Sequence, residues 1–291
     1  MLKLALPKGS LEEATMKLFA DANLTVRRLT ARSYNATIND KRISEVCILR
    51  PQEIPSYVAD GLFDMGITGR DWILETNKQV ESLGELPYSK STSQPIRLVL
   101  AVADNSHIRT KEELQDGVRI STEYVELARR YCDSLGITAK IDFSYGATEA
   151  KVPDIADAIV DVTETGRSIA AANLRIVDTI ITSYTELIAN PGSAADSHKK
   201  QAMQQIHTLL SGVLTAREKL LVKVNVPNSA LDSVIDIMPC MKSPTVSKLF
   251  KEAGYAVEAV VPREQINVLI PELHDLGATD ILAIPISMAV P

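Results

Sequence analysis

Four short apolar segments of this chain each end in a glycine- or hydroxyl-containing turn that leads straight into an amphipathic segment. This repeat restricts the fold more than any other feature, and the segments lie at residues 2–6, 63–67, 118–120 and 157–161. Such alternation is typical of α/β proteins with a mainly parallel sheet. Ligands bind at the carboxyl ends of strands in these sheets, so the four turns are predicted to line one crevice. Residues 38–43 predict one antiparallel hairpin turn within the series.

The order of these elements also divides the chain. Residues 97–103 predict a strand crossing between two lobes, and residues 194–219 predict a helix that returns to the first lobe. After this helix the expected order is βαββαβ, that of a ferredoxin-like sandwich. We therefore predict an α/β protein with lobe I at 1–104 plus 183–217, lobe II at 105–182, and a further domain at 218–291.

Residues 157–168 (DAIVDVTETGRS) carry the most specific chemistry. Asp157 and Asp161 are predicted to share one face of a strand, because side chains alternate with a period of two. The turn around Gly166 then begins a helix, whose first backbone N–H groups have no partner within the helix and bind phosphate. A phosphorylated ribose suits both halves: the turn binds its 5′-phosphate and the carboxylates bind its hydroxyls. The segment predicts a phosphoribosyl pyrophosphate site.

Two cationic residues follow other predicted strands. Lys8 precedes a helix with a possible capping box of Ser10 and Glu13. A lysine at this end of a helix costs about 0.3–1 kcal/mol, and a bound anion would reverse that sign. The alternative is a well-capped helix without a ligand. Arg50 ends another strand. Its side chain either binds a crevice phosphate or lies at the surface in solvent, and the local sequence favours neither.

Three further positions have a binding interpretation and a structural one. Gly69 would let a flat ligand approach the backbone, or it belongs to a tight turn with Asp71 as the helix N-cap. Tyr124 would flank an adenine ring, or it packs between layers. Glu149 would accept a hydrogen bond from an exocyclic amine, or it is a solvated loop acid.

The composition excludes several classes of protein. Four histidines and three cysteines share no spacing typical of a metal site or a catalytic triad. The net charge is 31 − 37 = −6 and aromatic residues make up 4%, which argues against nucleic-acid binding. No window approaches the run of about 18 apolar residues that a membrane helix needs. Residues 1–21 lack the pattern of a signal peptide, so a cytoplasmic location is expected.

With these residues identified, the chain resembles the long form of the ATP phosphoribosyltransferase family, which catalyses the first step of histidine biosynthesis. The motifs that carry the resemblance cover essentially the whole chain in order and lie at residues 6–11, 50–55, 64–69, 122–124, 157–168, 243–246 and 280–285. The resemblance implies a catalytic unit of two lobes like those of periplasmic binding proteins, with the substrates in the cleft. It further implies a C-terminal regulatory domain that binds histidine, assembly into dimers and hexamers, and a requirement for Mg²⁺.

The resemblance also implies roles for individual residues. The 5′-phosphate would be held by Glu164, Thr165, Gly166, Arg167 and Ser168, with Asp157 and Asp161 facing the ribose. The pyrophosphate region would contain Gly9 and the catalytic residues Lys8 and Arg50, and the ATP side would contain Gly69, Asp71, Tyr124 and Glu149. Ser243 and Thr245 would belong to the regulatory site, and the metal ligands are not identified. The chain departs from the family at Ser168, where threonine is usual, and at 172–173, where asparagine-glycine is common.

The expected reaction joins ATP and phosphoribosyl pyrophosphate. N1 of the adenine attacks C1 of the sugar and expels pyrophosphate, giving phosphoribosyl-ATP, and histidine inhibits the enzyme by feedback. Because N1 already has a lone pair, no strong general base is needed. Two alternatives remain open from the sequence: a two-lobed small-molecule binding or sensor module, and a phosphoribosyltransferase that acts on another base.

Overall fold

Parallel strands form the centre of the N-terminal part of the chain, as the alternation of apolar and amphipathic segments predicts. The computed structural model describes residues 1–28, 30, 33–89, 94–251 and 253–290. It divides into two compact units, the first made of Met1–Ala20 and Leu24–His207, the second of Asp21–Asn23 and Thr208–Pro291. The first unit contains lobe II and the greater part of lobe I, whose residues 21–23 and 208–217 belong to the second unit. The domain limits expected near 104, 183 and 218 stay a prediction, but the segment 97–103, expected to cross between the lobes, pairs instead within the sheet of lobe II as β7 (Ile96–Ala103).

Lobe I is built on a sheet with the strand order β2-β3-β4-β1-β5-β12-β6. Its strands are β1 (Leu2–Pro7), β2 (Val26–Arg28), β3 (Asn35–Ile38), β4 (Ile43–Leu49), β5 (Met65–Gly69), β6 (Glu81–Leu86) and β12 (Thr185–Ala189). β1 runs parallel to β4 and β5, and its residues are mostly buried, as expected for a strand covered on both faces. β3 and β4 pair antiparallel, which confirms the hairpin predicted at 38–43.

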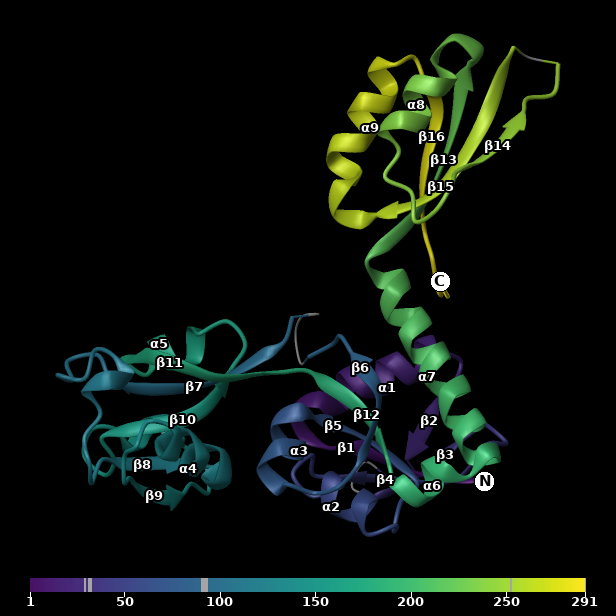
Figure 1. Cartoon of the computed structure of the whole chain (residues 1–291). Coiled ribbons are helices and arrows are strands. Elements are labelled where there is room, and N and C mark those ends of the chain that lie inside the picture. The colour runs from purple at the N-terminus through teal and green to yellow at the C-terminus, as the bar shows by residue number, and fades with distance from the viewer. Residues whose placement is uncertain (29, 31–32, 90–93, 252, 291) are drawn as a thin grey trace. The chain divides into compact units, whose positions relative to one another are not determined.

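Helices cover this sheet (Figure 1). They are the 3₁₀ turn Gly9–Leu11, α1 (Glu12–Asp21), α2 (Ile54–Ala59), α3 (Arg70–Thr76) and α6 (Pro191–Ala195). The capping box predicted at Ser10 and Glu13 is wrong. Lys8 is the N-cap residue, and Gly9, with a φ of +85°, starts the 3₁₀ turn earlier than expected. The Gly9 N–H therefore points to Glu12 Oε2 at 3.4 Å.

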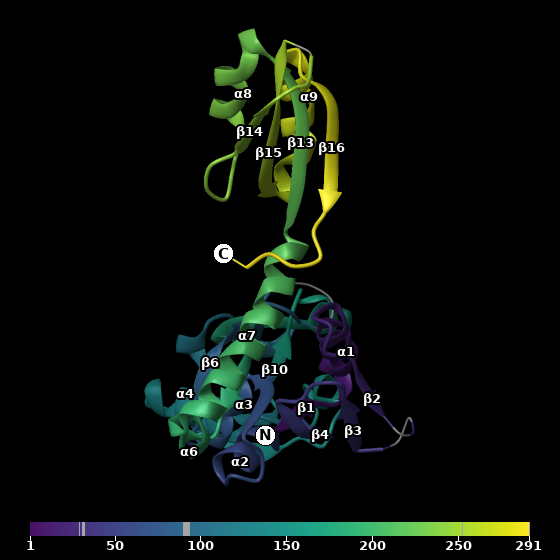
Figure 2. The same cartoon turned by 90° about the vertical axis from the view of Figure 1, so that its right-hand side faces the viewer.

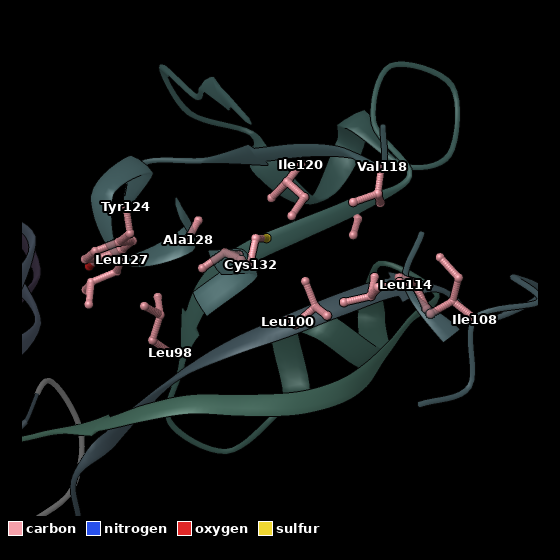
Figure 3. Close-up of a cluster of buried hydrophobic side chains, with 13 residues drawn as sticks. Leu98, Leu100, Ile108, Leu114, Val118, Ile120, Tyr124, Leu127, Ala128 and Cys132 are labelled. Atoms are coloured by element: carbon pink, nitrogen blue, oxygen red, sulfur yellow. The ribbon is translucent and has the colours of Figure 1, made fainter. Parts of the chain in front are cut away.

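Lobe II has the strand order β11-β7-β10-β8-β9. Its elements are β7 (Ile96–Ala103), β8 (Arg119–Thr122), α4 (Val125–Ser134), β9 (Lys140–Phe143), β10 (Ala158–Thr163), α5 (Arg167–Ala171) and β11 (Leu174–Ser183), with 3₁₀ turns at Lys111–Glu113 and Thr148–Lys151. Figure 3 shows its core, in which Leu98 and Leu100 of β7 pack with Leu127 and Cys132 of α4. Tyr124 lies at one end of this core.

The chain passes between the lobes twice, after β6 and after β11. β7 is antiparallel to both β10 and β11, with Arg97 opposite Thr163 and Ile96 opposite Ser183. The first passage therefore enters lobe II, and the second leaves it, at the edge of the sheet where β10 ends. Because β8 and β10 are parallel, the turn after β8 lies at that edge as well.

The second unit is a ferredoxin-like sandwich. Its elements are β13 (Lys219–Pro227), the 3₁₀ turn Asn228–Ala230, α8 (Leu231–Ile237), β14 (Thr245–Lys248), β15 (Gly254–Pro262), the 3₁₀ turn Arg263–Gln265, α9 (Ile266–Asp275) and β16 (Thr279–Pro285). The antiparallel strands follow the order β14-β15-β13-β16, and α8 and α9 cover one face (Figures 1 and 2). Val222, Val234, Val257 and Leu273 are fully buried between the layers. The predicted βαββαβ order is confirmed.

The long helix predicted at 194–219 is also confirmed, as α7 (Ser197–Arg217). The first unit ends within this helix at His207 and the second continues from Thr208. Near its end, Arg217 forms an ion pair with Asp21 of the same unit at 3.0 Å. In the part of the chain that is described, no helix is long and apolar enough to cross a membrane.

Candidate active site

The carboxyl ends of the parallel strands carry the residues that the sequence singles out. In lobe I, Lys8 follows β1, Arg50 follows β4 and Gly69 ends β5, and these strands are neighbours. In lobe II, Tyr124 follows β8, and the loop that contains Gly166 follows β10. The strand topology alone thus gathers the predicted residues at one edge of each sheet, as the α/β pattern implies.

Both lobes contribute to two cavities that share Ser10, Pro51, Trp72, Tyr124 and Val162. The larger has a volume of about 710 Å³ and is also lined by the predicted residues Lys8, Gly9 and Arg50. The smaller has a volume of about 250 Å³ and is also lined by Gly69, Asp71 and Glu164. Because the lining is shared, we treat the two cavities as one cleft. It has the size and concavity of an ordinary small-molecule site.

A buried carboxylate joins the lobes at the floor of the cleft. Asp71 Oδ2 accepts a hydrogen bond of 2.7 Å from the Tyr124 hydroxyl, and Oδ1 accepts one of 2.6 Å from Ser183 Oγ. Burial raises the pKa of Asp71 above its ordinary value, against the opposing effect of these donors. The N-cap role expected for Asp71 is wrong, because Gly69 is the N-cap of α3. A Cβ at Gly69 would lie 2.0 Å from Asp71 Oδ1, so this position has room only for glycine.

The Tyr124 side chain is buried in the lining of the cleft and does not present an open ring face on which a base could stack. Its ring stacks on that of Trp72 with centroids 4.2 Å apart and planes 25° apart, and 4% of the residue is exposed. Burial, followed by the charge of Asp71, raises the pKa of the Tyr124 hydroxyl well above its ordinary value. One face of the ring is therefore already covered by lobe I. A contact between Tyr124 or Asp71 and a nucleotide stays a prediction.

A second contact between the lobes lies beside this one. Glu75 of α3 accepts hydrogen bonds of 2.9 Å from the backbone N–H groups of both Glu126 and Leu127, in the first turn of α4. A carboxylate at a helix N-terminus satisfies donors that have no partner within the helix and interacts favourably with the helix dipole. Arg130 of α4 donates in turn to the carbonyl of Leu74. Lobe I thus caps a helix of lobe II.

The loop after β10 has the shape expected of a phosphate-binding turn. Gly166 has a φ of +80° and is the N-cap of α5, and its N–H donates to Thr163 Oγ1 at 2.9 Å. Glu164 accepts a hydrogen bond of 2.6 Å from Ser89 Oγ, which ties the loop to the first passage between the lobes. Thr165, Arg167 and Ser168 are exposed. After α5, Asn173 takes a left-handed φ of 57°, a conformation that suits asparagine or glycine.

Asp157 and Asp161 lie in different surroundings. Asp157 precedes the strand, accepts from the N–H and guanidinium of Arg119, and lines a different cavity of about 590 Å³. Four residues of a strand span about 13 Å, so alternation alone does not bring the two carboxylates together. The structure does not bring the two carboxylates together, and the ribose contact predicted for Asp157 stays a prediction. Arg119 lowers the pKa of Asp157 below its ordinary value, chiefly through hydrogen bonding.

Asp161 is the acid that remains near the phosphate loop. Burial raises its pKa to about 6, and the negative charges of Glu149 and Glu123 add to the effect. Glu149, which is partly buried in the 3₁₀ turn after β9, is therefore close enough to act electrostatically on Asp161. Neither acid lines the two cleft cavities, so their contact with a substrate stays a prediction.

The remaining predicted residues belong to the second unit. Ser243 and Thr245 are both exposed, and Thr245 begins the edge strand β14 opposite Glu258 of β15. Their regulatory role stays a prediction.

Several residues of the cleft were not found from the sequence. Trp72 and Gln52 line it, Glu75 and Ser183 hold its wall, and Thr163 holds the phosphate loop. Only Thr163 had a local signal, because a hydroxyl three residues before a glycine N–H is a common turn motif. The others act across long sequence separations.

Fold and cleft together define a two-lobed α/β protein with a small-molecule cleft and a separate ferredoxin-like unit. The family model for ATP phosphoribosyltransferase (HisG) matches residues 50–212, and that for the HisG C-terminal domain matches residues 216–288. The ATP phosphoribosyltransferase of Pelotomaculum thermopropionicum is 46% identical over 100% of this chain and 99% of its own length. That of Thermodesulfovibrio yellowstonii is 45% identical with the same coverage of both chains.

A solved structure agrees with these sequence relatives. The ATP phosphoribosyl transferase (HisG:HisZ) complex from Thermotoga maritima contains a chain that is 30% identical, with a TM-score of 0.63 over 74% of this chain and 99% of that chain. The chain belongs to the ATP phosphoribosyltransferase family, and it is a transferase of histidine biosynthesis.

We expect Tyr124→Phe to lower the free energy of unfolding of the first unit by about 1–3 kcal/mol, since it keeps the stack on Trp72 but removes a donor from buried Asp71. Urea denaturation measures the change. Tyr145→Phe, at a tyrosine that is 94% exposed in the same lobe, is the matched control and should leave stability unchanged. Equal stability of both variants would show that the buried hydrogen bond contributes nothing.

Proposed function

We propose that the enzyme joins ATP to 5-phosphoribosyl 1-pyrophosphate, with N1 of the adenine displacing pyrophosphate from C1 of the sugar. The product is phosphoribosyl-ATP. The observation that carries the proposal is a single cleft that has the cationic residues Lys8 and Arg50 of lobe I on one side and Thr163–Glu164 of the phosphate loop on the other. A substrate with a phosphate at one end and a pyrophosphate at the other suits this separation of groups.

The 5′-phosphate belongs at the loop after β10. Thr163 holds Gly166 in place, and the exposed first turn of α5 supplies backbone N–H groups that are suited to an anion. The side chain of Glu164 is a hydrogen-bond acceptor, so it would position the loop through Ser89 rather than bind the phosphate itself. Asp161 is the carboxylate suited to the ribose hydroxyls.

The pyrophosphate belongs beside lobe I. Lys8 Nζ lies 4.6 Å from the centre of the Tyr34 ring, a contact that keeps the cation at the cleft. Lys8 and Arg50 would neutralise charge that develops on the leaving group. N1 attacks with its own lone pair, so no residue has to remove a proton. The contribution of the chain is alignment of the two substrates in a closed cleft.

We propose Mg²⁺ as the required ion. Magnesium is usually held by one or two carboxylates together with substrate phosphates rather than by a cage of protein ligands. In the described parts of the chain, no group of three or more His, Cys, Asp or Glu residues is arranged to hold a metal by itself. Asp161 and Glu149 are the carboxylates that would hold an ion arriving with the activated sugar, and the ion would neutralise charge on the phosphate groups of that substrate.

The direct test is to mix the protein with ATP, phosphoribosyl pyrophosphate, Mg²⁺ and pyrophosphatase and to follow adduct absorbance. Lys8→Ala should lower kcat by about 10²-fold or more, because removing one group that stabilises transition-state charge costs about 3 kcal/mol. Lys3→Ala is the matched control, since Lys3 lies on the same strand and pairs with Glu45 at 3.6 Å. A Lys8→Ala enzyme with an unchanged kcat would exclude the role of Lys8.

Asp161 provides a pH test. Its pKa is raised to about 6, so it is ionised above that pH and protonated below it. We expect the KM for phosphoribosyl pyrophosphate to rise as the pH falls through 6, and Asp161→Asn to abolish this dependence. Asp157→Asn should keep it, since Arg119 holds the pKa of Asp157 low. A pH profile that is the same in wild type and Asp161→Asn would contradict the assignment.

The same pKa has a consequence for stability. Between the ordinary value of 3.8 and about 6, native Asp161 holds its proton more tightly than the unfolded chain does. Its contribution to the free energy of unfolding therefore falls as the pH rises through this range. Asp161→Asn should remove that slope.

We also propose feedback inhibition by histidine at the second unit, in a homo-oligomer such as a dimer or hexamer. Support comes from the match of residues 216–288 to the HisG C-terminal domain and from the exposure of Ser243 and Thr245. A coupling free energy of about 1–3 kcal/mol between the sites is typical of allostery.

Histidine should then lower kcat without raising the KM for ATP. The double variant Ser243→Ala/Thr245→Ala should weaken inhibition at least 5-fold, whereas Ser229→Ala, at an exposed serine of the same unit, should not. Competition between histidine and ATP in steady-state kinetics would contradict the proposal.

A further inference from the structure

Gln52 lies in the cleft with one half of its amide unused. It follows Arg50 and Pro51 in the turn between β4 and α2, and it lines the larger cavity. Its Nε2 donates to Glu123 Oε2 of lobe II at 3.5 Å. Its Oε1 is buried, and among the residues that the structure describes no donor bonds to it. A buried carbonyl without a partner is unfavourable by about 1–3 kcal/mol, which a ligand that donates a hydrogen bond would offset.

The proposed reaction restricts which edge of adenine the enzyme can bind. N1 lies on the Watson–Crick edge and must keep its lone pair free for C1 of the sugar. A side chain that donates to N1 would block the attack. Recognition of the base therefore has to use the opposite, Hoogsteen edge, where the 6-amino group donates and N7 accepts. A primary amide is the side-chain group that presents an acceptor and a donor side by side, and glutamine pairs with adenine N6 and N7 in this way in DNA recognition.

We infer that Gln52 is the residue that selects adenine, with Oε1 accepting from the 6-amino group and Nε2 donating to N7. The inference rests on the proposed function. Glu123 fixes the orientation of the amide, because only its Nε2 half can donate to a carboxylate. The bond of 3.5 Å is at the upper limit for a hydrogen bond, and the second Nε2 hydrogen remains for N7.

The surroundings of Gln52 suit a nucleotide in this position. The same cavity is lined by Lys8 and Arg50, which would lie near phosphate groups, and by the rings of Tyr34 and Tyr57. Its volume of about 710 Å³ is in the range of ligand pockets. Guanine would be rejected, since its 6-oxo group would place an acceptor against Oε1. Specificity would thus arise from one favourable pairing and one repulsive pairing on the same amide.

The test compares ATP with two analogues, 7-deaza-ATP, which lacks N7, and purine riboside triphosphate, which lacks the 6-amino group. In the wild-type enzyme each lost contact should lower kcat/KM by about 10- to 100-fold relative to ATP. In Gln52→Ala, kcat/KM for ATP should fall by a similar factor, and the preference for ATP over each analogue should shrink by at least 10-fold. The analogues also differ in the reactivity of N1, but that difference is the same for both enzymes. The change in preference between enzymes therefore reports only the contact.

Two further variants complete the design. Gln52→Leu keeps the size of the side chain and should show the same loss of preference. It replaces Gln52→Ala in the comparison if circular dichroism shows that the alanine variant folds poorly. Gln115→Ala replaces an exposed glutamine outside the cleft and should keep the wild-type preference. An unchanged preference for ATP in folded Gln52→Ala or Gln52→Leu would overturn the inference and leave the proposed function intact. Absence of adduct from the wild-type enzyme with ATP would instead overturn the proposed function.

Discussion

The cleft depends on one buried carboxylate. Asp71 lies in lobe I. Its carboxylate accepts hydrogen bonds from Tyr124 of lobe II and from Ser183 at the second passage between the lobes. It therefore joins the three segments that meet at the cleft floor. A buried acid is costly unless its oxygens have donors, and here each oxygen has one. The requirement for space explains Gly69, since any side chain there would overlap the carboxylate. With Glu75 capping α4 beside it, lobe I determines where lobe II can lie.

This arrangement suits a reaction that needs alignment more than acid–base chemistry. The contacts that hold the lobes, Asp71 to Tyr124 and Glu75 to α4, are made by groups that are already paired within the protein. In the proposed function, the groups that would face substrate are the cations of lobe I, the loop after β10 and the amide of Gln52. The residues that hold the lobes together are thus different from those that would act on the substrate.

Much of the fold could be predicted from the sequence, because period and turn chemistry are local. The parallel sheets, the hairpin at 38–43, the long helix and the βαββαβ order all follow from such patterns, and so does the gathering of Lys8, Arg50 and the Gly166 loop at strand ends. The features that the sequence did not predict depend on distances and contacts between residues that are far apart along the chain. Alternation put Asp157 and Asp161 on one face, but four residues of a strand separate them by about 13 Å. The hydrogen bonds between Asp157 and Arg119, 38 residues away, have no local signal in the sequence. The stack of Trp72 on Tyr124 and the reach of Glu75 into another lobe leave no local trace.

The acids near the phosphate loop show why the site was recognisable at all. Carboxylates beside an anion site are unfavourable unless hydroxyls or a cation lie between them, so their presence points to a sugar and a metal rather than to a phosphate alone. Burial, together with the smaller effect of the negative charges of Glu149 and Glu123, raises the pKa of Asp161 to about 6. A divalent cation would reverse both effects, because it favours the ionised form. Binding of an activated sugar together with its ion would therefore favour ionisation of Asp161, and ionisation would in turn favour binding.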